Sequence, residues 1–443
     1  MKTLFLVDDY TIDPLGTAWL SSYLKDAGHE VRLHKTKYNH TFSVIEEYQP
    51  DILCYSTTTG KHTYYRDLNN RIRATYEALS VFGGPHPTLF PKYAMEDGVD
   101  VAVMGEGYDA IVDIANACEI GGTMANIPNV VIKDKINAVR PLKDKHNLLH
   151  PDRELIYSYP ENYNNPIKNI MASFFCPYNC PYCGNYKYKE MYRIKKAQLR
   201  PVSDVAEEAL ELKDYPLELI FFQDDIFPIY NKGWIDMFCK QYPQVNVPFH
   251  IQTRVEFINN DIIRQLKEVG LHSVTFAIES GNSRLRWSVL ERKMSDKIIL
   301  KGAEILHKYG IKFRTENMIG IPEETMETAL ETLDLNIECN PTIAWASLFQ
   351  PYPGTKLGER CLRDGSYDGN MENLSESFFG DYVIKNESAK QFNKLQKLFS
   401  FVVKHKWLRP FIKPLMLLPF NYRKLYQKTK VKLYKQLYMV EKC

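Results

Sequence analysis

The stretch Phe175-Cys-Pro-Tyr-Asn-Cys-Pro-Tyr-Cys183 places three cysteines, Cys176, Cys180 and Cys183, in one short segment with the spacing C-x3-C-x2-C. A structural zinc site uses four ligands, usually as two pairs, and no second Cys or His pair stands nearby. Three thiolates can instead hold an iron–sulfur cluster and leave one iron open to another ligand. The intervening prolines favour a tight loop. The spacing therefore indicates a cluster-binding loop, with a partial zinc site or a chance spacing as the alternatives.

The cysteine loop follows the first of six predicted strands that alternate with helices. Six such units in about 185 residues are too few for a full eight-unit barrel, which takes about 250 residues. We therefore expect a partial (β/α)6 barrel over residues 167–353, with the cysteines at the carboxyl ends of its strands, where barrel enzymes place their chemistry. The predicted strands are 167–173, 217–223, 249–254, 273–279, 312–319 and 343–349, and the predicted helices are 202–213, 234–241, 261–269, 295–308 and 325–337.

The first 125 residues also alternate between strand and helix patterns, which predicts a doubly wound, Rossmann-like parallel sheet. In such sheets ligands bind at the carboxyl ends of the strands. Loops of small or turn-forming residues follow three of the strands, at 56–60, 83–87 and 105–107. The predicted strands are 4–7, 31–33, 52–55, 81–82 and 101–104, with helices at 17–27 and 65–78.

The remaining segments have other patterns. Residues 126–166 are predicted to be a linker with a hairpin at 129–136, and residues 354–443 a helical, basic C-terminal region. Residues 401–443 contain eleven Lys or Arg and one acid, a net charge of +10, so the rest of the chain carries −8 of the total +2. This tail could rest on an anionic membrane surface, bind a phosphorylated or lipid-linked substrate, or simply cap the barrel. Nucleic acid is the least favoured partner because no recognition motif accompanies the basic tail.

The chain is expected to be cytoplasmic, either free or peripheral at the inner membrane face. Its first residues reach acids, Asp8 and Asp9, too early for a signal peptide. No apolar run approaches the roughly 18 residues of a spanning helix. An odd number of cysteines, nine, with three in one loop, indicates a reducing compartment. The other six are expected to be mostly small buried hydrophobes: Cys54, Cys118, Cys239, Cys339, Cys361 and Cys443.

Over roughly residues 1–355 the chain resembles the radical S-adenosylmethionine (SAM) enzymes that carry an N-terminal cobalamin (B12)-binding domain. The cysteine spacing after the first barrel strand, with the aromatic Tyr182 before Cys183, is one part of this resemblance. Six further motifs carry the rest of it: Pro14-Leu-Gly16, Gly83-Gly-Pro-His86, Met104-Gly-Glu-Gly107, Phe222-Gln-Asp-Asp225, Phe276-Ala-Ile-Glu-Ser-Gly281 and Ile319-Gly-Ile-Pro-Glu-Glu324.

Four features depart from the pattern of this family. Phe175 stands where a glycine usually precedes the first cysteine, Ala277 replaces the glycine of the fourth-strand motif, and Tyr108 replaces an acid after Gly107. The D-x-H-x-x-G signature, which supplies a cobalt-binding histidine in other cobalamin proteins, is absent. By resemblance, this absence implies a cobalt ion without a histidine ligand from the protein.

The resemblance implies a [4Fe–4S] cluster on Cys176, Cys180 and Cys183, with SAM on the fourth iron. Reductive cleavage of SAM would give a 5′-deoxyadenosyl radical, and cobalamin would supply a methyl group to a substrate radical. The expected enzyme methylates an unactivated carbon, or phosphorus, of a small or lipid-linked metabolite, and takes electrons from a flavodoxin- or ferredoxin-type donor. The alternatives are a cobalamin-dependent radical cyclase or rearrangement enzyme without methyl transfer, and a non-catalytic cofactor-binding partner. No catalytic residue is predicted beyond the cofactor ligands.

The SAM contacts are expected at the carboxyl ends of the barrel strands. Carboxylates there can accept charge-assisted hydrogen bonds from the SAM ammonium or bind the ribose hydroxyls, and an arginine can pair with the SAM carboxylate. Backbone near Ile321 can line the adenine. The alternatives are a solvated turn for the two aspartates, a surface acid for the glutamate and a structural ion pair for the arginine. The predicted contacts are Tyr182, Asp224, Asp225, Arg254, Glu279 and Ile321.

The cobalamin contacts are expected in the three loops of the N-terminal domain. Missing Cβ atoms would let a large ligand approach the backbone. His86 would contact the cobalamin tail or serve as a structural histidine, rather than bind metal. The alternative for the domain as a whole is a relic that has lost cobalamin. The predicted contacts are Ser56, Thr57, Thr58, Gly83, Gly84, His86, Gly105, Glu106 and Gly107.

Overall fold

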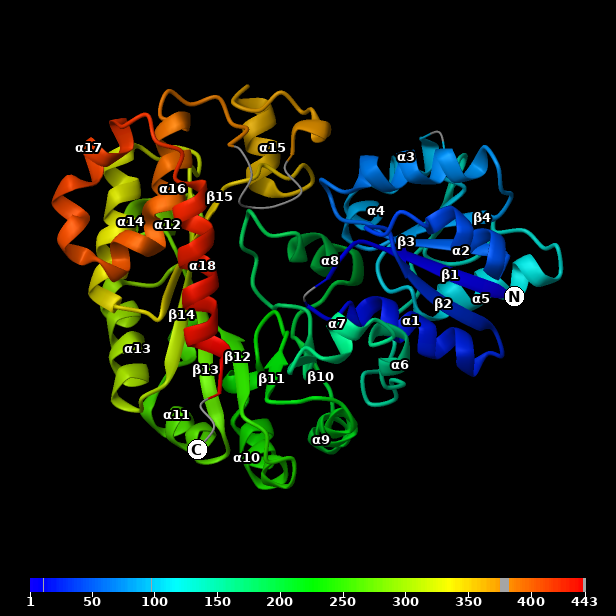
Figure 1. Cartoon of the computed structure of the whole chain (residues 1–443), viewed down its shortest axis with the longest axis horizontal. Helices are drawn as coiled ribbons and strands as arrows, with labels where there is room; N and C mark the ends of the chain where they lie inside the picture. The colour runs from blue at the N-terminus through cyan, green and yellow to red at the C-terminus, as the bar shows by residue number, and fades with distance from the viewer. Residues whose placement is uncertain (11, 97, 375–381, 441–443) are drawn as a thin grey trace. The chain divides into compact units, whose positions relative to one another are not determined.

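The computed structural model describes residues 1–10, 12–96, 98–374 and 382–440 (Figure 1). The chain forms two compact units. The first comprises Met1–Asn165 and Gly184–Lys195, and the second comprises Pro166–Cys183 and Lys196–Cys443. The chain therefore enters the second unit for the cysteine loop, returns to the first for twelve residues, and then completes the second.

The first unit is built on a seven-stranded sheet with the order β2-β1-β3-β4-β5-β6-β7. Its first five strands are parallel, which confirms the doubly wound sheet. The order reverses between β1 and β3, and ligands bind at such a switch point in open α/β sheets. The strands are β1 (Lys2–Val7), β2 (Glu30–Lys35), β3 (Ile52–Ser56), β4 (Leu79–Gly83), β5 (Val101–Val103), β6 (Val130–Ile132) and β7 (Lys135–Ile136).

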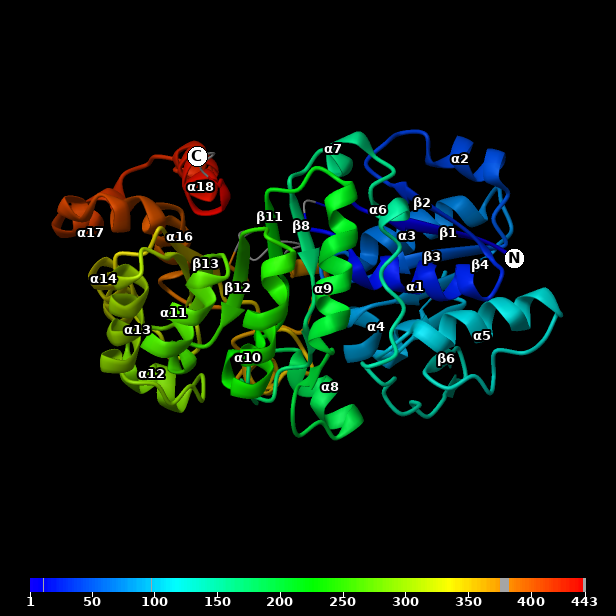
Figure 2. The ribbon, with the colours of Figure 1, turned by 90° about the horizontal axis from the view of Figure 1, so that it is seen from below.

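Helices lie on both faces of this sheet. Ile45, Tyr65 and Ile72 of α2 and α3 pack against one face, while Trp19 of α1 stacks edge-on with Tyr108 of α5. Figure 2 shows α1 and α5 along the sheet. The helices of the unit are α1 (Leu15–Asp26), α2 (Thr41–Tyr48), α3 (His62–Arg73), α4 (Pro85–Leu89), α5 (Tyr108–Glu119), α6 (Arg153–Ile156), α7 (Pro160–Tyr163) and α8 (Asn185–Tyr192).

Residues 126–165 belong to the first unit rather than forming a separate linker. The predicted hairpin is confirmed as β6 and β7, which extend the sheet antiparallel. Further along, Trp19 Nε1 donates to the Leu149 carbonyl at 2.9 Å and Ser21 Oγ donates to Asp152 Oδ2 at 2.6 Å. These bonds fasten the segment to α1, so this unit extends beyond the expected boundary at residue 125.

The second unit contains a six-stranded parallel sheet with the order β15-β14-β13-β12-β11-β8. Because β8 and β15 are both edges, the barrel is open, as the six-unit pattern predicted. Asn259, Ser295 and Thr325 cap α11, α13 and α14 with their side chains. The strands are β8 (Ile167–Ile170), β11 (Leu219–Phe222), β12 (Phe249–Thr253), β13 (Leu271–Glu279), β14 (Lys312–Ile319) and β15 (Ile343–Leu348), and the helices between them are α9 (Val202–Glu211), α10 (Lys232–Gln241), α11 (Asn260–Glu268), α12 (Ser283–Ser288), α13 (Asp296–Lys308) and α14 (Met326–Cys339).

The first barrel strand is shorter than predicted. It ends at Ile170, and a separate two-residue strand, β9 (Ser173–Phe174), pairs antiparallel with β10 (Gln198–Leu199). The cysteine loop begins directly after β9. The two strands of this short antiparallel pair therefore flank the cysteine loop and α8 in the chain.

The C-terminal region is helical, as expected, and consists of α15 (Lys356–Arg363), α16 (Ala389–Lys404), α17 (Ile412–Leu417) and α18 (Arg423–Tyr438). The end of α18 packs on the barrel strands, where Tyr438 contacts the rings of Phe221 and His250. Figure 1 shows α18 running alongside β13 and β14. Among the residues that the structure describes, no helix combines the length and apolar character needed to cross a membrane.

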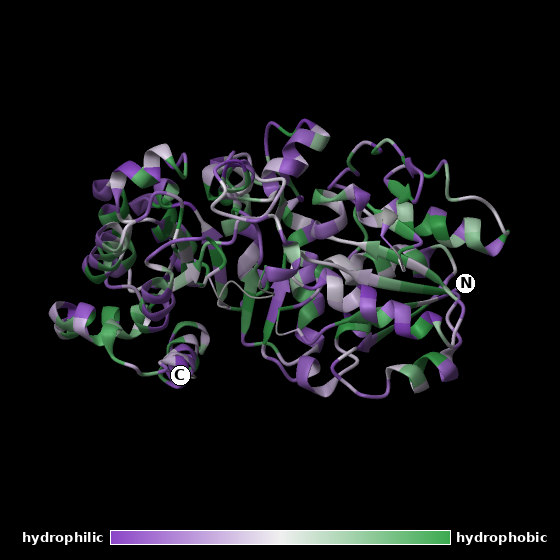
Figure 3. Ribbon diagram, turned by 90° about the horizontal axis from the view of Figure 1, so that it is seen from above, coloured by the Kyte–Doolittle hydropathy of each residue, from purple (hydrophilic) through white to green (hydrophobic). Residues whose placement is uncertain are grey.

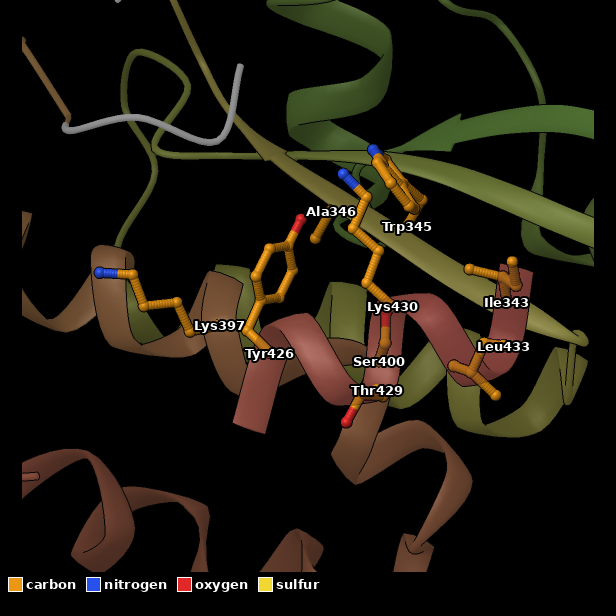
Figure 4. Close-up of a pocket in the computed structure, with 9 residues that line it drawn as sticks. All are labelled: Ile343, Trp345, Ala346, Lys397, Ser400, Tyr426, Thr429, Lys430 and Leu433. Atoms are coloured by element: carbon orange, nitrogen blue, oxygen red, sulfur yellow. The ribbon is translucent and has the colours of Figure 1, made fainter. Parts of the chain in front are cut away.

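A small pocket lies among α16, α18 and β15 (Figure 4). Its lining includes Trp345, Tyr426 and Lys430, and the Lys430 ammonium lies 5.0 Å from the centroid of the Trp345 ring. The pocket is part of the packing between the C-terminal helices and the last barrel strand.

Candidate functional site

The three loop cysteines form no disulfide, and each is half-buried. The Cys183 N–H donates to the Cys180 carbonyl at 3.1 Å, which closes the second half of the loop. Burial raises the pKa of the Cys176 thiol to about 11, and the charges of Asp225 and Cys180 add to this effect, whereas the Tyr178 backbone N–H and Arg254 oppose it. Cys176 and Cys180 therefore lie within electrostatic reach of each other.

Phe175, one of the departures from the family pattern, has a φ of +66°. This is the left-handed region that glycine adopts without cost and that a bulky residue rarely occupies. The turn into the cysteine loop thus has a left-handed backbone, which explains why the family usually has glycine at this position. In this chain phenylalanine adopts that conformation.

The donor set of the loop fits an iron–sulfur cluster, which is held by cysteine thiolates. Within the described ranges, no three His, Cys, Asp or Glu side chains surround a position suited to one metal ion. A cubane cluster does not need such convergence, because each thiolate binds a different iron. Three half-buried thiols in one loop match that requirement.

Asp224 is completely buried and supports the start of the cysteine loop. Its Oδ1 accepts from Ser173 Oγ at 2.5 Å, and its Oδ2 accepts from the Ala172 N–H at 3.3 Å. Burial raises the pKa of Asp224 to about 7 despite these bonds. The geometry of Asp224 favours a supporting role, and its contact with SAM stays a prediction. The neighbouring Asp225 is exposed.

Tyr182, Glu279 and Arg292 form one hydrogen-bonded cluster. The Tyr182 hydroxyl donates to Glu279 Oε1 at 3.0 Å and accepts from Arg292 Nη1 at 3.3 Å, while Arg292 Nη2 donates to the Ala277 carbonyl at 2.8 Å. Burial raises the pKa of Glu279 to about 7 although the Arg292 charge opposes this. The structure therefore brings together two of the predicted SAM residues and connects them directly to the third cysteine, which follows Tyr182.

Two local features orient this cluster. The pairing of β13 with β14 shifts register between Ala277 and Glu279, and Glu279 has a φ of +68°. The irregularity turns the carboxylate toward Tyr182. Arg292 was missed by sequence reasoning because it lies in a loop after α12 and belongs to no motif; its buried Nε has no hydrogen-bond partner among the described residues.

Arg254 contacts the cysteine loop through Tyr178. Its guanidinium lies 3.8 Å from the Tyr178 ring centroid, and it also pairs with Glu256, with Nε 3.1 Å from Oε1. The structural ion pair considered from sequence is thus present, and the contact to SAM stays a prediction. The Ile321 side chain is buried in a core with Met318, so any contact to the adenine would come from its backbone, as predicted.

In the N-terminal unit, the ends of β3 and β4 lie side by side, with Ser56 paired to Gly83. Ser56 and Thr58 are exposed, whereas Thr57 is buried. A Cβ on Gly83 would have no neighbour within 4 Å, but one on Gly84, whose φ is +99°, would lie 2.9 Å from the Thr57 carbonyl oxygen. Gly84 therefore shapes the turn, while the space beside Gly83 fits the close approach of a large ligand.

His86 is buried, and the structure favours the structural alternative for it. Its Nδ1 lies 3.0 Å from Thr59 Oγ1, and its ring stacks on His62 with centroids 4.2 Å apart. Burial, together with the His62 charge, lowers the pKa of His86 to about 3, so the ring is neutral. Its Nε2 has no partner among the described residues.

The loop Gly105-Glu106-Gly107 is occupied by bonds within the unit. The Glu106 carboxylate accepts from Lys145 Nζ and, at 2.9 Å, from the Lys143 N–H. The Glu106 N–H donates to the Tyr192 hydroxyl at 2.8 Å, and a Cβ on Gly105 would lie 1.9 Å from the same oxygen. The cobalamin contacts of this loop stay predictions, and Tyr192 is a neighbour that no sequence signal indicated.

Comparison with known families agrees with this geometry. A model of the radical SAM superfamily matches residues 170–335, and a model of the B12 binding domain matches residues 1–115. The chain belongs to the radical SAM enzymes that carry an N-terminal B12-binding domain. The resemblance found in the sequence motifs is confirmed, because the first match spans the cysteine loop and the second spans the three loops of the doubly wound sheet.

The matches to curated relatives are low in identity but cover most of this chain. An uncharacterized methyltransferase of Pyrococcus horikoshii is 25% identical over 366 residues, which cover 79% of this chain and 78% of the relative. The anaerobic magnesium-protoporphyrin IX monomethyl ester cyclase of Rubrivivax gelatinosus is 24% identical over 78% of this chain and 65% of the relative.

Two solved structures show the same fold class. The radical SAM methyltransferase TsrM from Kitasatospora setae, with cobalamin and a [4Fe-4S] cluster bound, has a TM-score of 0.68 at 16% identity and covers 82% of this chain and 75% of its own. The cobalamin-dependent radical SAM enzyme OxsB, with aqua-cobalamin bound, has a TM-score of 0.70 at 14% identity and covers 98% of this chain and 72% of its own. At these identities the likeness concerns the fold, and it confirms the fold class expected from sequence.

Proposed function

We propose that this chain is a cobalamin-dependent radical SAM methyltransferase. The observation that carries the proposal is the three-cysteine loop at the carboxyl-end side of the open barrel, in a chain whose first 115 residues match the B12 binding domain. The relatives support methyl transfer, because they include a cytidylyl-2-hydroxyethylphosphonate methyltransferase of Streptomyces wedmorensis and a hopanoid C-3 methylase of Methylococcus capsulatus.

Cys176, Cys180 and Cys183 are the proposed ligands of the [4Fe–4S] cluster. When bound, the cluster would supply the electron that cleaves SAM and cobalamin would supply the methyl group. Asp224 would fix the entry to the loop through Ser173 and Ala172. The site thus needs no further cysteine, and the family pattern assigns none.

The SAM-binding roles proposed for the other residues follow from their positions. Asp225 is exposed and close enough to Cys176 for its charge to raise the thiol pKa, so it can accept from the SAM ammonium. Arg254, whose guanidinium lies over the Tyr178 ring, can pair with the SAM carboxylate. Glu279 can bind the ribose hydroxyls while Tyr182 and Arg292 hold its carboxylate in place. These three side chains surround the cysteine loop on separate strand ends.

The proposed substrate is a small or lipid-linked metabolite methylated at carbon or phosphorus, and the proposed electron donor is a flavodoxin or ferredoxin. Relatives of both substrate kinds support this range, since their names specify a phosphonate and hopanoids. The proposed location is the cytoplasm, with membrane contact through the C-terminal region.

A radical cyclase without methyl transfer is the second candidate. It is favoured by the magnesium-protoporphyrin cyclases of Rubrivivax gelatinosus and Cereibacter sphaeroides, both 24% identical to this chain. The two candidates differ in whether SAM is used for methyl donation as well as for cleavage, so product analysis separates them.

The test is turnover of the anaerobically reconstituted and reduced holoenzyme with SAM. A methyltransferase should release both 5′-deoxyadenosine and S-adenosylhomocysteine, whereas a cyclase should release only the first. The Cys180→Ala variant should lose SAM cleavage yet keep cobalamin uptake, while Cys118→Ala, a half-buried thiol of the other unit, should behave as wild type. Parental 5′-deoxyadenosine formation by Cys180→Ala would overturn the cluster assignment, and none from the wild type would favour a non-catalytic cofactor-binding protein.

A further inference from the structure

The segment 406–424 exposes an unusual concentration of large apolar side chains. Single exposed apolar residues are normal on a protein surface, but a contiguous group marks an interaction site. Trp407 is 67% exposed and Leu417 is 74% exposed. Figure 3 shows this part of the chain, around α17, as alternating hydrophobic and hydrophilic ribbon. The exposed apolar residues within fourteen consecutive positions are Trp407, Phe411, Leu417, Leu418 and Phe420.

The segment is held in a defined conformation while it exposes these side chains. Ile412 and Met416 are buried in a core that includes residues of α14 and α16. Lys394 of α16 donates to the carbonyls of Met416 at 2.8 Å and Leu418 at 2.6 Å, which closes the end of α17. The exposed apolar residues therefore belong to a segment that is packed and hydrogen-bonded in place.

All charged side chains in the stretch of chain that carries this surface are positive. Residues 388–440 contain thirteen Lys or Arg and no Asp or Glu. Two of the basic residues pair with acids of α14: Arg409 binds Asp334, with Nη2 2.8 Å from Oδ2, and Lys413 lies 3.5 Å from Glu327. The basic residues of this stretch therefore far outnumber the two acids that pair with them.

Several cations of the surface are available to a partner. Lys406, Arg423 and Lys424 are exposed, and none of them forms an ion pair with an acid in the part of the chain that the structure describes. They lie close in sequence to Trp407 and Phe420, so the cationic and aromatic side chains alternate along the segment. A partner that fits must offer both negative charge and an apolar layer.

We propose that the 406–424 surface binds the interface of an anionic lipid bilayer. Tryptophan and phenylalanine partition into the headgroup region, and neighbouring lysine and arginine side chains bind anionic lipids. The helix α17 has six residues and cannot span a bilayer, so the segment would lie in the plane of the interface. A second copy of this chain is disfavoured because the two like-charged surfaces would repel each other.

The proposal is tested by flotation of the holoenzyme with vesicles of phosphatidylcholine alone or mixed equally with phosphatidylglycerol. The wild type should float only with the mixed vesicles, and added salt should weaken the binding because it screens the charges. Replacing Lys406→Gln and Arg423→Gln together should weaken the partition about tenfold or more, since each basic residue near an anionic surface contributes roughly fivefold. Trp407→Ser with Leu417→Ser should weaken it by about as much through lost apolar burial.

Matched controls come from exposed residues elsewhere: Lys297→Gln on α13 and Ile120→Ser, whose side chain is 82% exposed. Both should float as the wild type does, and all variants should keep the wild-type melting temperature. Absence of wild-type flotation with the mixed vesicles, or equal losses in the controls, would overturn the proposal. So would a wild-type dimer that Trp407→Ser with Leu417→Ser converts to a monomer without changing flotation, because a second copy would then occupy the surface. Since vesicle binding needs no turnover, this result is independent of the proposed reaction.

Discussion

Three carboxyl groups of the second unit lie at or just after the ends of barrel strands, where Asp224 and Glu324 are buried and Glu279 is half-buried. Their pKa values are raised to about 7 for Asp224 and Glu279 and about 8 for Glu324. Asp224 is bonded to Ala172 and Ser173, just before the cysteine loop, and Glu279 is bonded to Tyr182 within it. Glu324 accepts from the Gly320 N–H through Oε2, and its Oε1 has no partner among the described residues. Burial costs each of them more when charged than when protonated.

Glu324 should make the stability of the second unit depend on pH. Its pKa is about 8 when folded and 4.5 as the reference value, so the folded state holds a proton that the unfolded state has lost. The free energy of unfolding should therefore fall as pH rises between about 4.5 and 8, by about 1.4 kcal/mol per pH unit. Glu324→Gln removes this dependence, so the unfolding free energy of the variant minus that of the wild type should increase with pH.

Urea unfolding of the wild type and Glu324→Gln in parallel, from pH 5 to pH 8, measures this difference. A difference that stays the same at every pH would show that the Glu324 carboxyl does not titrate as its burial requires.

At the scale of single residues, the sequence could propose positions for the site but could not show their contacts. Asp224 is predicted at SAM because it ends a strand beside Asp225, and the structure adds that its two oxygens accept from Ser173 and Ala172. That role depends on a partner about fifty positions away, and spacing along the chain carries no information about it. Arg292 was missed for the same reason, since only the folded structure brings it to Tyr182.

Among the elements, the junction of β4 and α4 contains two glycines with different roles. Gly84 is required by the backbone, whereas Gly83 leaves room for a ligand. Gly84→Ala should destabilise the first unit by about 1–3 kcal/mol, because φ is +99° and the new Cβ would lie 2.9 Å from the Thr57 oxygen. Gly83→Ala meets nothing within 4 Å, so it should keep the melting temperature of the wild type and instead reduce cobalamin uptake. Thermal melting and cobalamin titration of the two variants measure both effects; equal melting temperatures for Gly84→Ala and Gly83→Ala would contradict this account.

The helix α8, which follows the third cysteine, is bonded to the rest of the first unit through Tyr192. Its hydroxyl accepts from the Glu106 N–H and from Asn129 Nδ2 at 3.2 Å. Tyr192→Phe would leave these buried donors without that acceptor, at a cost of about 1–3 kcal/mol. We expect faster hydrogen exchange across residues 184–195 in Tyr192→Phe and no change in Tyr64→Phe, an exposed tyrosine of α3. Unchanged exchange in Tyr192→Phe would mean that the hydroxyl does not hold this helix.

The long elements were predictable and the short ones were not. Five strands of the first sheet and six of the second follow apolar runs, and the structure confirms them within a few residues. The strands β9 and β10 have two residues each, too few to show any period. Asp224 bonds residues 172 and 173 beside this pairing, a tertiary contact that no local pattern could show. The packing of α18 on the barrel strands was one of three alternatives for the tail, and apolar content alone could not choose among them.

For the whole molecule, the sequence predicted two α/β parts in the correct order but not how the chain is shared between them. The segment 126–166 was expected to be a linker with a hairpin and a polar stretch, yet side-chain bonds such as that of Trp19 to Leu149 join residues 126–165 to the first unit. The return of residues 184–195 to the first unit has no signature in composition. The chain therefore passes through the cysteine loop between two segments that belong to different units.

Metal analysis of the anaerobically purified chain tests the central claim, that three thiolates of one loop hold a four-iron cluster in a protein that also binds cobalamin. We expect about four irons and about one cobalt per wild-type chain. Cys180→Ala should lose the iron and keep the cobalt. One zinc per chain in place of iron, or a full iron content in Cys180→Ala, would contradict the account, and iron without cobalt would contradict its cobalamin half.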